Sequence, residues 1–330
     1  MGADWEFTTG NALTRKAWAK DWWMEAKTES YFYGNGFVGV SEDNIIVEFP
    51  DLEKDQGDVL TYGQIRELSG AGVANDAIME GNEEAPETYD DAITIAQIRN
   101  AIRTKGRESD QRPSDKKLRQ YAKELLRRWM SATIDQSIFT ALADSLTKVI
   151  YGGDATGTGD IEVADKMTLA LISKCAVYAK KASPLIIGPT VKGKQMAGVI
   201  IISPDQLYDI TENDTNWAQA QREAQKRGAD NPVFSGAPGI WKNVVIHDHI
   251  RIPIATNWGG TTNLPGATAL FLGIQSGAIA YAKKKIWEEK TFDYQNKVGF
   301  CIGSLYGVTK SVFNGADNAV AGVRTYRTNN

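Results

Sequence analysis

The sequence predicts a mixed α+β fold that contains one very long helix and one extended β-hairpin. Three observations carry this prediction. Residues 57–103 are extended and rich in turns, residues 114–148 keep a helical period without any Gly or Pro, and the chain after residue 184 interleaves helical and strand-like segments.

Length and composition set the limits of the interpretation. A chain of 330 residues exceeds the size at which one core usually keeps growing, so two or more sub-domains are expected. The hydrophobic content of 42% and charged content of 24% are those of a globular protein. The formal charge of -4 excludes nucleic-acid binding over most of the surface, so any contact with DNA must be local. Two cysteines, Cys175 and Cys301, are too few for a disulfide framework and are expected as free thiols.

The first 23 residues are unusually rich in tryptophan. They hold four of the nine in the chain, namely Trp5, Trp18, Trp22 and Trp23. These anchors either pack on the core of their own chain or belong to an arm that packs on a neighbouring subunit, because aromatic side chains dominate interfaces. Residues 1–10 have neither a basic region nor an apolar run, so we expect no signal peptide and synthesis in the cytoplasm.

Two strand-like segments bracket a long excursion. Val59, Thr61 and Ile65 begin one segment, and the β-branched alternation of residues 92–98 forms the other. The connection is punctuated by glycine at 69–73 and is acidic at 81–87. Compact domains seldom carry so long a connection without a function, so an extended β-hairpin or arm is predicted.

The long helix is expected from about residue 114 to about residue 148. Pro113-Ser114-Asp115 is a helix-start signal, and at 1.5 Å per residue the helix would be on the order of 50 Å long. An apolar stripe is predicted from Leu118, Tyr121, Ala122, Leu125, Trp129, Ala132 and Ile138. The stripe is not a strict heptad, which favours a rod lying across a sheet over a coiled coil.

The second half of the chain mixes helices and strands. Ser203-Pro204-Asp205 is expected to cap a helix, and the buried-strand pattern of residues 197–202 precedes it. The other expected elements are a helix at 164–182, a polar surface helix at 215–227, a strand at 244–254 and a strand-rich region at 267–323.

Three motifs that could carry chemistry are discounted. Residues 34–39 have the Gly spacing of a dinucleotide site but lack a strand before and a helix after them. Residues 188–195 resemble a P-loop, yet Gln195 replaces the Ser or Thr that holds magnesium, and a strand follows. His247 and His249 form a strand pair without a third ligand of known spacing. The sequence therefore predicts no enzyme, with no catalytic residue, no cofactor and no metal site.

Charge is strongly segregated along the chain. Residues 67–98 hold eight acidic and no basic residues, whereas residues 99–128 hold eleven basic and four acidic residues, a net charge of +7. This split favours docking between identical subunits, although two solvated faces or an interior surface that touches phosphates would also produce it. The candidate contact residues are acidic Glu80, Glu83, Glu84, Glu87, Asp90 and Asp91, and basic Arg99, Arg103, Arg107, Arg112, Lys116 and Arg119.

Several short segments, in order along most of the chain, resemble a known family. They lie at 57–61, 68–73, 79–84, 97–102, 111–112, 125–135, 269–277 and 307–313. In these segments the chain resembles the major capsid proteins of tailed bacteriophages with the HK97 fold, and within them the N-four-like podovirus group.

The resemblance implies a division of the chain and a structural function. It implies an N-terminal arm (1–50), an E-loop (51–104), a peripheral domain with a spine helix (105–184), an axial domain (185–265) and C-terminal strands that return to the peripheral domain (266–330). It further implies self-assembly into the hexamers and pentamers of an icosahedral virion shell around double-stranded DNA, with assembly in the host bacterial cytoplasm.

The resemblance also implies partners and leaves two alternatives open. The expected partners are further copies of the chain, a separate scaffolding protein, a portal, decoration proteins and non-specifically contacted DNA, but no membrane. One alternative is an encapsulin-like cellular nanocompartment, which shares the fold. The other is a nucleotide-dependent enzyme that uses the loop at 188–195.

Overall fold

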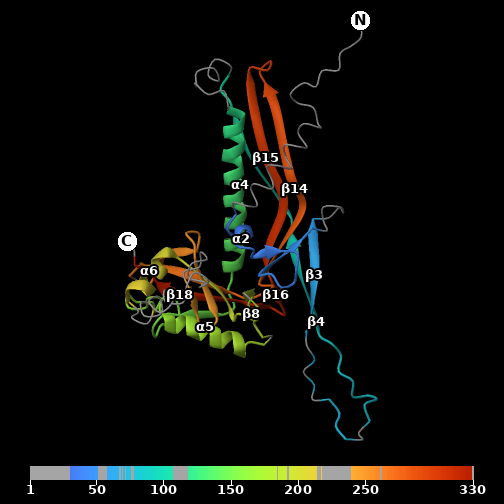
Figure 1. Ribbon diagram of the computed structural model, residues 1–330, viewed down its shortest axis with the longest axis vertical. Coiled ribbons are helices and arrows are strands. Elements are labelled where there is room, and N and C mark those ends of the chain that lie inside the picture. Colours follow the sequence, from blue (N-terminus) through green and yellow to red (C-terminus); the bar gives the residue numbers. More distant parts are fainter. Residues whose placement is uncertain are drawn as a thin grey trace. The chain divides into compact units, whose positions relative to one another are not determined.

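The structure, a computed structural model, divides into two compact units (Figure 1). The first comprises Met1–Leu60, Ile93–Ile138 and Ala278–Val308, and the second Thr61–Ala92, Phe139–Gly277 and Thr309–Asn330. The residues that the structure describes are 30–50, 58–66, 68, 70, 72–75, 78–106, 118–183, 185–191, 193–213, 217, 239–260 and 262–328.

The first unit is built on a five-stranded sheet. Its strand order is β1 (Val38–Gly39), β2 (Ile46–Phe49), β14 (Gly277–Phe292), β15 (Lys297–Lys310) and β5 (Ala96–Arg103). β5 runs antiparallel to β15 and forms one edge of the sheet. Gly307 of β15 lies close to the end of β4 (Thr88–Thr94), where a Cβ atom would overlap the carbonyl oxygen of Thr94.

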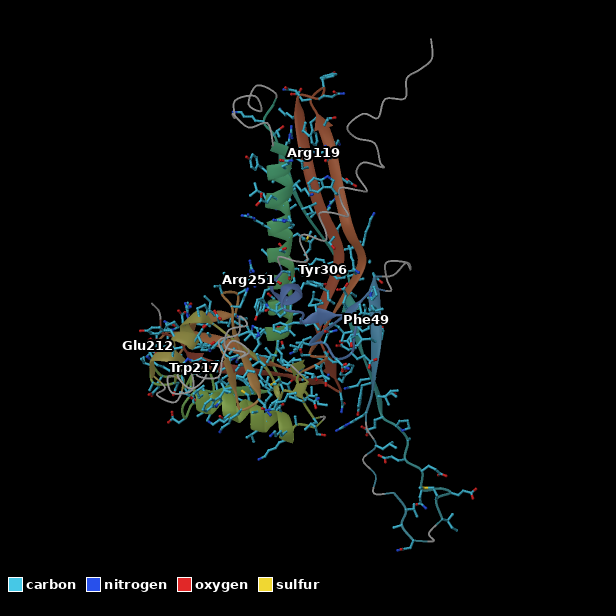
Figure 2. The ribbon with its side chains drawn as sticks, viewed as in Figure 1. Phe49, Arg119, Glu212, Trp217, Arg251 and Tyr306 are labelled. Carbon is cyan, nitrogen blue, oxygen red and sulfur yellow. The ribbon has the colours of Figure 1, made fainter. Side chains whose placement is uncertain are left out.

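The long helix α4 (Leu118–Ala143) runs along this sheet within the first unit. Near its start the Arg119 guanidinium binds Glu289 on β14, and further along Ser137 Oγ lies 3.0 Å from the Tyr306 hydroxyl on β15 (Figure 2). A helix of 26 residues is about 39 Å long at 1.5 Å per residue. The predicted rod across a sheet is confirmed.

Two details of the predicted helix were wrong, and its expected start lies outside the described residues. The helix ends at Ala143, not near 148, because Ser145 takes a positive φ of 42° and Val149 already belongs to β6 (Val149–Tyr151). Tyr121 and Leu125 are 48% and 60% exposed. The buried positions instead recur every four residues, at Ala122, Leu126, Met130, Ile134, Ile138 and Leu142.

The short helix α2 (Tyr31–Gly34) is held by α4 within the same unit. The carboxylate of buried Asp135 accepts hydrogen bonds from Tyr31 N at 2.9 Å and Phe32 N at 3.5 Å. Asp135 therefore supplies the acceptor that an N-cap side chain usually provides, since Ser30 makes no capping bond of its own.

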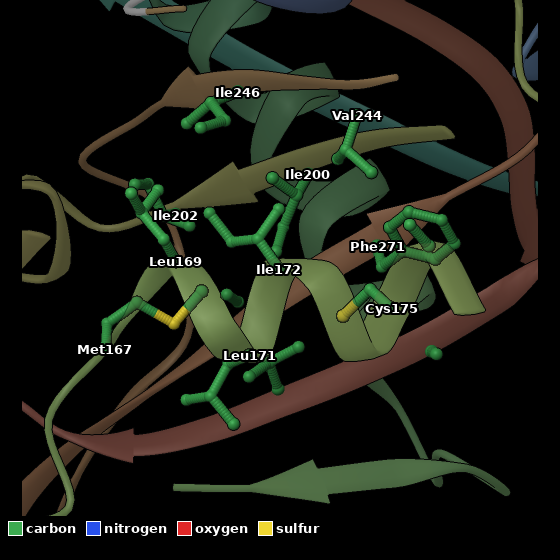
Figure 3. Packing of buried hydrophobic residues seen from close by; sticks show 14 of the residues in the cluster. Met167, Leu169, Leu171, Ile172, Cys175, Ile200, Ile202, Val244, Ile246 and Phe271 are labelled. Carbon is green, nitrogen blue, oxygen red and sulfur yellow. The ribbon is translucent and has the colours of Figure 1, made fainter. Parts of the chain in front are cut away.

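The second unit is built on a seven-stranded sheet. Its order is β10 (Gly239–Trp241), β11 (Val244–Asp248), β9 (Gly198–Ile202), β13 (Leu264–Leu272), β18 (Val320–Tyr326) and β6, with β12 (Ile254–Trp258) also paired to β13. All five residues of β9 are buried, as its apolar run predicted. The helix α5 (Leu169–Lys181) packs its apolar face on this sheet, with Ile172 and Cys175 beside Ile200 and Phe271 (Figure 3).

Two predicted elements of this unit have different bounds from those expected, and a third lies almost wholly outside the described residues. The helix expected at 164–182 begins only at Leu169, and the strand expected at 244–254 is two strands, β11 and β12, separated by the turn at 249–253. The helix expected at 215–227 lies outside the described residues except for Trp217, which is helical and buried. The capped helix is confirmed as α6 (Pro204–Asn213), in which Gln206 N donates to Ser203 Oγ at 3.2 Å and Ser203 N donates to Gln206 Oε1 at 2.9 Å.

The predicted extended hairpin is confirmed. β3 (Val59–Ile65) pairs with β4 (Thr88–Thr94), and residues 66–87 connect them. Its base is fixed in the second unit, because Asp91 accepts hydrogen bonds from the Tyr62 hydroxyl at 2.8 Å and from Val312 N at 3.0 Å. Tyr62 also packs edge-on against Phe313, which pairs in the small sheet of β16 (Val312–Phe313) and β17 (Ala316–Asp317).

Candidate assembly surfaces

The acidic connection of the extended hairpin exposes its charge. We call residues 78–91 the acidic hairpin; they hold six carboxylates and no Lys or Arg. Glu83 accepts a hydrogen bond from Gly81 N at 2.8 Å, and Glu84 accepts one from Gly70 N at 2.7 Å. Both side chains are exposed, as are Glu80 and Asp90, so these carboxylates shape the connection and still face solvent.

Two of the acidic candidates, Glu87 and Asp91, have partners within their own chain. Glu87 accepts hydrogen bonds from Arg66 Nη1 at 3.3 Å and from the Tyr89 hydroxyl at 3.0 Å. Asp91 is half-buried by its bonds to Tyr62 and Val312. The six candidates thus divide into Glu80, Glu83, Glu84 and Asp90, which are exposed, and exposed Glu87 and half-buried Asp91, whose bonds hold the hairpin together.

The hairpin also exposes large apolar side chains, which the sequence analysis missed. Ile65, Leu68, Ile78 and Met79 are 76%, 64%, 74% and 53% exposed. Such side chains normally mark surfaces that another molecule covers. The available signal was the presence of Ile and Met inside an acidic, turn-rich stretch, where apolar residues have no periodic pattern to join.

The basic candidate residues differ from one another in exposure and in their partners. Arg99 and Arg103 are exposed on the edge strand β5. Arg119 is paired within its own chain, because its Nε and Nη2 atoms donate to Glu289 Oε1 at 3.0 Å and 2.5 Å. Outside the described residues lie Arg107, Arg112 and Lys116, together with the four arm tryptophans Trp5, Trp18, Trp22 and Trp23.

The first unit contains a buried polar cluster that stabilises the fold. The hydroxyls of Tyr33 and Tyr281 lie 2.8 Å apart, and Lys284 forms an ion pair with Glu48 at 3.0 Å. Burial raises the pKa of both phenols well above the ordinary value, so both remain protonated at neutral pH. These groups hold β2, α2 and β14 together.

Each of the three discounted motifs has a defined local structure. Thr190–Val191 (β7) and Lys194–Gln195 (β8) pair as a small antiparallel hairpin rather than as a strand–loop–helix. Residues 34–39 begin at the last residue of α2 and end in β1. His249 stacks on Phe139 with ring centroids 4.9 Å apart, and its Nδ1 accepts a hydrogen bond from Arg251 N. Within the described part of the chain, no group of three His, Cys, Asp or Glu side chains is arranged to hold a metal ion.

Comparisons with known proteins agree over nearly the whole chain. Residues 6–149 and 147–326 match the family model described as phage capsid protein. The major capsid protein of Pseudomonas phage KPP25 is 25% identical over 342 residues, which cover 91% of this chain and 89% of that protein.

Solved structures give the same result. The capsid of Ralstonia phage GP4 superimposes with a TM-score of 0.81 and 26% identity, covering 92% of both chains. The capsid of cyanophage Pam1 gives a TM-score of 0.78 at 20% identity, covering 100% of this chain and 97% of that one. These are HK97-like capsid folds, which confirms the predicted fold class.

Among the residues that the structure describes, no helix is both long and apolar enough to span a bilayer.

The two-unit α+β fold, the extended hairpin and the family match over residues 6–326 lead to one assignment. The chain belongs to the phage capsid protein family and is a capsid shell subunit.

Proposed function

We propose that this chain assembles into hexamers and pentamers of an icosahedral virion shell that encloses double-stranded DNA. The observation that carries the proposal is the extended hairpin, which exposes four large apolar side chains on a segment that Asp91 and Arg66 bind to the rest of the second unit. Repeated modest contacts of this kind stabilise a closed symmetric assembly, because each subunit makes several of them.

The expected division of the chain is retained as part of the proposal. Residues 1–50 act as the arm, 51–104 as the E-loop, 105–184 as the peripheral domain with its spine helix, 185–265 as the axial domain, and 266–330 as the returning strands. The pairing of β3 with β4 supports the E-loop role, and the contacts of α4 with Glu289 and Tyr306 support the spine-helix role.

Charge complementarity is proposed to guide the contact between subunits. The exposed carboxylates Glu80, Glu83, Glu84 and Asp90 of one subunit face the basic region at 99–128 of a neighbour. Glu87 and Asp91 contribute by holding the hairpin in shape, since their carboxylates bind Arg66, Tyr62 and Val312. Opposite charges of this kind set the register and the rate of association more than its affinity.

Assembly takes place in the host bacterial cytoplasm, with a separate scaffolding protein, a portal and decoration proteins as partners. The family match and the relative from phage KPP25 favour a virion over a cellular nanocompartment. The pairing of β7 with β8 supports a role without nucleotide chemistry, because the loop at 188–195 does not lead into a helix.

The proposal is tested by charge reversal on the hairpin. The variant Glu83→Lys/Glu84→Lys is expected to remain folded but to lose particles that sediment as shells. The matched variant Glu83→Gln/Glu84→Gln keeps the acceptors that bind Gly81 N and Gly70 N and removes only the charge. Reversal should therefore be more damaging than neutralisation, and normal shells from the reversed variant at moderate salt would contradict the charge-guided contact.

A further inference from the structure

A pocket of about 210 Å³ lies in the second unit, beside the C-terminal end of α5. Its apolar lining includes the buried residues Ile186, Ala319 and Val320, and Tyr178 of α5 also lines it. An apolar cavity of about 150 Å³ in another protein is large enough to hold benzene. The pocket therefore has room for one aromatic ring with a short substituent.

A cation and a phenol line the pocket together with these apolar side chains. The Lys148 ammonium lies 5.6 Å from the centroid of the Tyr178 ring. Among the described residues, the Lys148 ammonium forms no ion pair and the Tyr178 hydroxyl has no hydrogen-bond partner. Burial, and to a smaller extent the Asp317 carboxylate, raises the pKa of Tyr178, so its hydroxyl stays a donor at neutral pH. Both groups are thus available to an oxygen atom of a bound molecule.

The carboxylate that lines the pocket is already compensated. Asp317 Oδ1 lies 2.6 Å from Lys310 Nζ, and Asp317 Oδ2 accepts a hydrogen bond from Thr147 N at 2.8 Å. The Asp317 side chain is only 3% exposed. Lys148 therefore supplies the uncompensated charge of the pocket, which favours an anion that also has an apolar body.

The end of α5 does not cancel this positive charge. The last carbonyls of a helix carry a partial negative charge. Here Tyr178 O accepts a hydrogen bond from Ala182 N at 2.9 Å, and Ala179 O accepts one from Ile186 N at 3.1 Å. The last turn of α5 also carries two lysines, Lys180 and Lys181, so the helix end is positively charged.

One residue of the pocket has a strained backbone. Ala319 has a φ of 55°, a left-handed conformation that residues with a side chain rarely adopt. Its carbonyl oxygen accepts a hydrogen bond from Gly273 N at 2.8 Å, which holds the strained segment in place. Strained residues cluster at ligand sites, where the surrounding structure keeps them in position. The pocket is therefore preformed rather than a loose gap between side chains.

We propose that this pocket binds a small aromatic carboxylate as a free ligand. The ring packs on Ile186, Ala319 and Val320, and the carboxylate accepts hydrogen bonds from the Lys148 ammonium and the Tyr178 hydroxyl. The size of the pocket selects a single ring, and the uncompensated lysine selects the negative charge. This inference goes beyond the proposed shell function and does not depend on it.

A bound ligand would stabilise the part of the second unit that holds the extended hairpin. Ser183 lines the pocket and accepts a hydrogen bond from Arg66 Nη2 at 3.1 Å. Asp317 lines it as well and belongs to β17, which pairs with β16, and Phe313 of β16 packs on Tyr62 of β3. Because the ligand binds only the folded pocket, it raises the melting temperature by mass action.

Titration of benzoate into the full-length chain tests the proposal. Binding is followed by equilibrium dialysis and by thermal unfolding, beside benzamide, which has the ring without the charge, and acetate, which has the charge without the ring. We expect saturable binding of benzoate and a higher melting temperature. The Kd of benzoate should be at least tenfold lower than that of either comparison compound, because each lacks one of the two interactions.

Substitutions at the pocket assign the binding to these residues. Lys148→Gln should weaken benzoate binding at least tenfold and leave benzamide binding unchanged, because only the charge is lost. Tyr178→Phe keeps the ring and removes the hydroxyl, so it should weaken benzoate binding by a smaller factor. Lys174→Gln is the matched control, because Lys174 is an exposed lysine of α5 that does not line the pocket. Thermal unfolding without any probe shows that each variant is folded.

Three results would overturn the inference. They are no saturable binding of benzoate, equal affinities for benzoate and benzamide, and a Lys148→Gln protein that binds benzoate as the parent does. The first result would leave a protein side chain as the occupant of the pocket. The assay needs no assembled particles, so its failure is distinct from failure of the shell proposal, which is judged by whether the chain forms shells.

Discussion

Asp135 and Ser30, separated by more than a hundred positions in the chain, share a hydrogen bond of 2.5 Å in the interior of the first unit. The same carboxylate accepts bonds from the backbone N–H groups of Tyr31 and Phe32. One side chain of the long helix α4 thus fixes the position of α2.

Replacing Asp135 is expected to destabilise the protein. Asp135→Ala leaves two buried donors and one partly buried donor without this acceptor and should lower the free energy of unfolding by about 3 kcal/mol. Asp135→Asn keeps one acceptor and should cost about half as much. Denaturant unfolding of the variants measures both values, with exposed Gln120→Ala as a control within about 0.5 kcal/mol of the parent. Equal stability of Asp135→Ala and the parent would show that the contact is not stabilising.

The buried pair Lys310–Asp317 should show strong coupling. Lys310 Nζ lies 2.6 Å from Asp317 Oδ1 and donates to the carbonyl of Asp144 at 2.6 Å. Lys310→Met leaves a buried carboxylate uncompensated and should cost about 4 kcal/mol. Lys310→Met/Asp317→Asn should regain a large part of that loss, as a double-mutant cycle in denaturant would reveal. Additive effects of the two single substitutions would contradict the coupling.

Gly307 should not tolerate a side chain. A Cβ atom there would overlap Thr94 O and lie 2.7 Å from Ile93 Cγ2, so Gly307→Ala must move β15 away from the end of β4. We expect a loss of about 3 kcal/mol in thermal or denaturant unfolding. Gly159→Ala is the matched control, because a Cβ at Gly159 meets nothing within 4 Å. A Gly307→Ala protein as stable as the control would show that the two strands do not approach in this way.

Stability should fall in mildly acidic solution through His247. Burial lowers the pKa of His247 below its ordinary value, and nearby Asp248 opposes this shift only in part. The folded protein therefore keeps the imidazole neutral at a pH where the unfolded chain already binds a proton. This contribution is complete above the unfolded pKa of about 6.5 and is lost as the pH falls below it, by at most about 1.4 kcal/mol per pH unit. The free energy of unfolding should change less between pH 7.5 and pH 5.5 for His247→Gln than for the parent. An equal change in the two proteins would show that His247 is not the cause.

The hairpin and the long helix could be predicted from the sequence because their signals are local. Strand alternation on both sides of an acidic connection, and a helical period free of Gly and Pro, do not depend on distant residues. The end of α4 was not predictable in this way. Lys310, far along the chain, donates to the carbonyls of Asp144 and Ser145 where the helix stops.

The candidate contact residues could be predicted only as a charge pattern. Sequence counts treat Arg119 and Arg103 alike, yet Arg119 binds Glu289 whereas Arg103 lies exposed over the Phe292 ring. Glu289 and Phe292 both come from β14, and Glu289 lies 170 residues after Arg119. Which charges remain available for a partner is therefore decided by the tertiary fold. The pocket beside α5 depends in the same way on Ala319, whose positive φ no local pattern indicated.

Electron microscopy of the particles formed by the full-length chain tests the central claim most directly. We predict closed shells tens of nanometres across, whose reconstruction resolves hexamers and pentamers with the extended hairpin of each subunit lying on a neighbour. A monodisperse monomer that stays unassembled at high concentration, with crowding agents and with a scaffolding protein supplied, would contradict the account. So would a reconstruction in which the hairpin contacts only its own subunit.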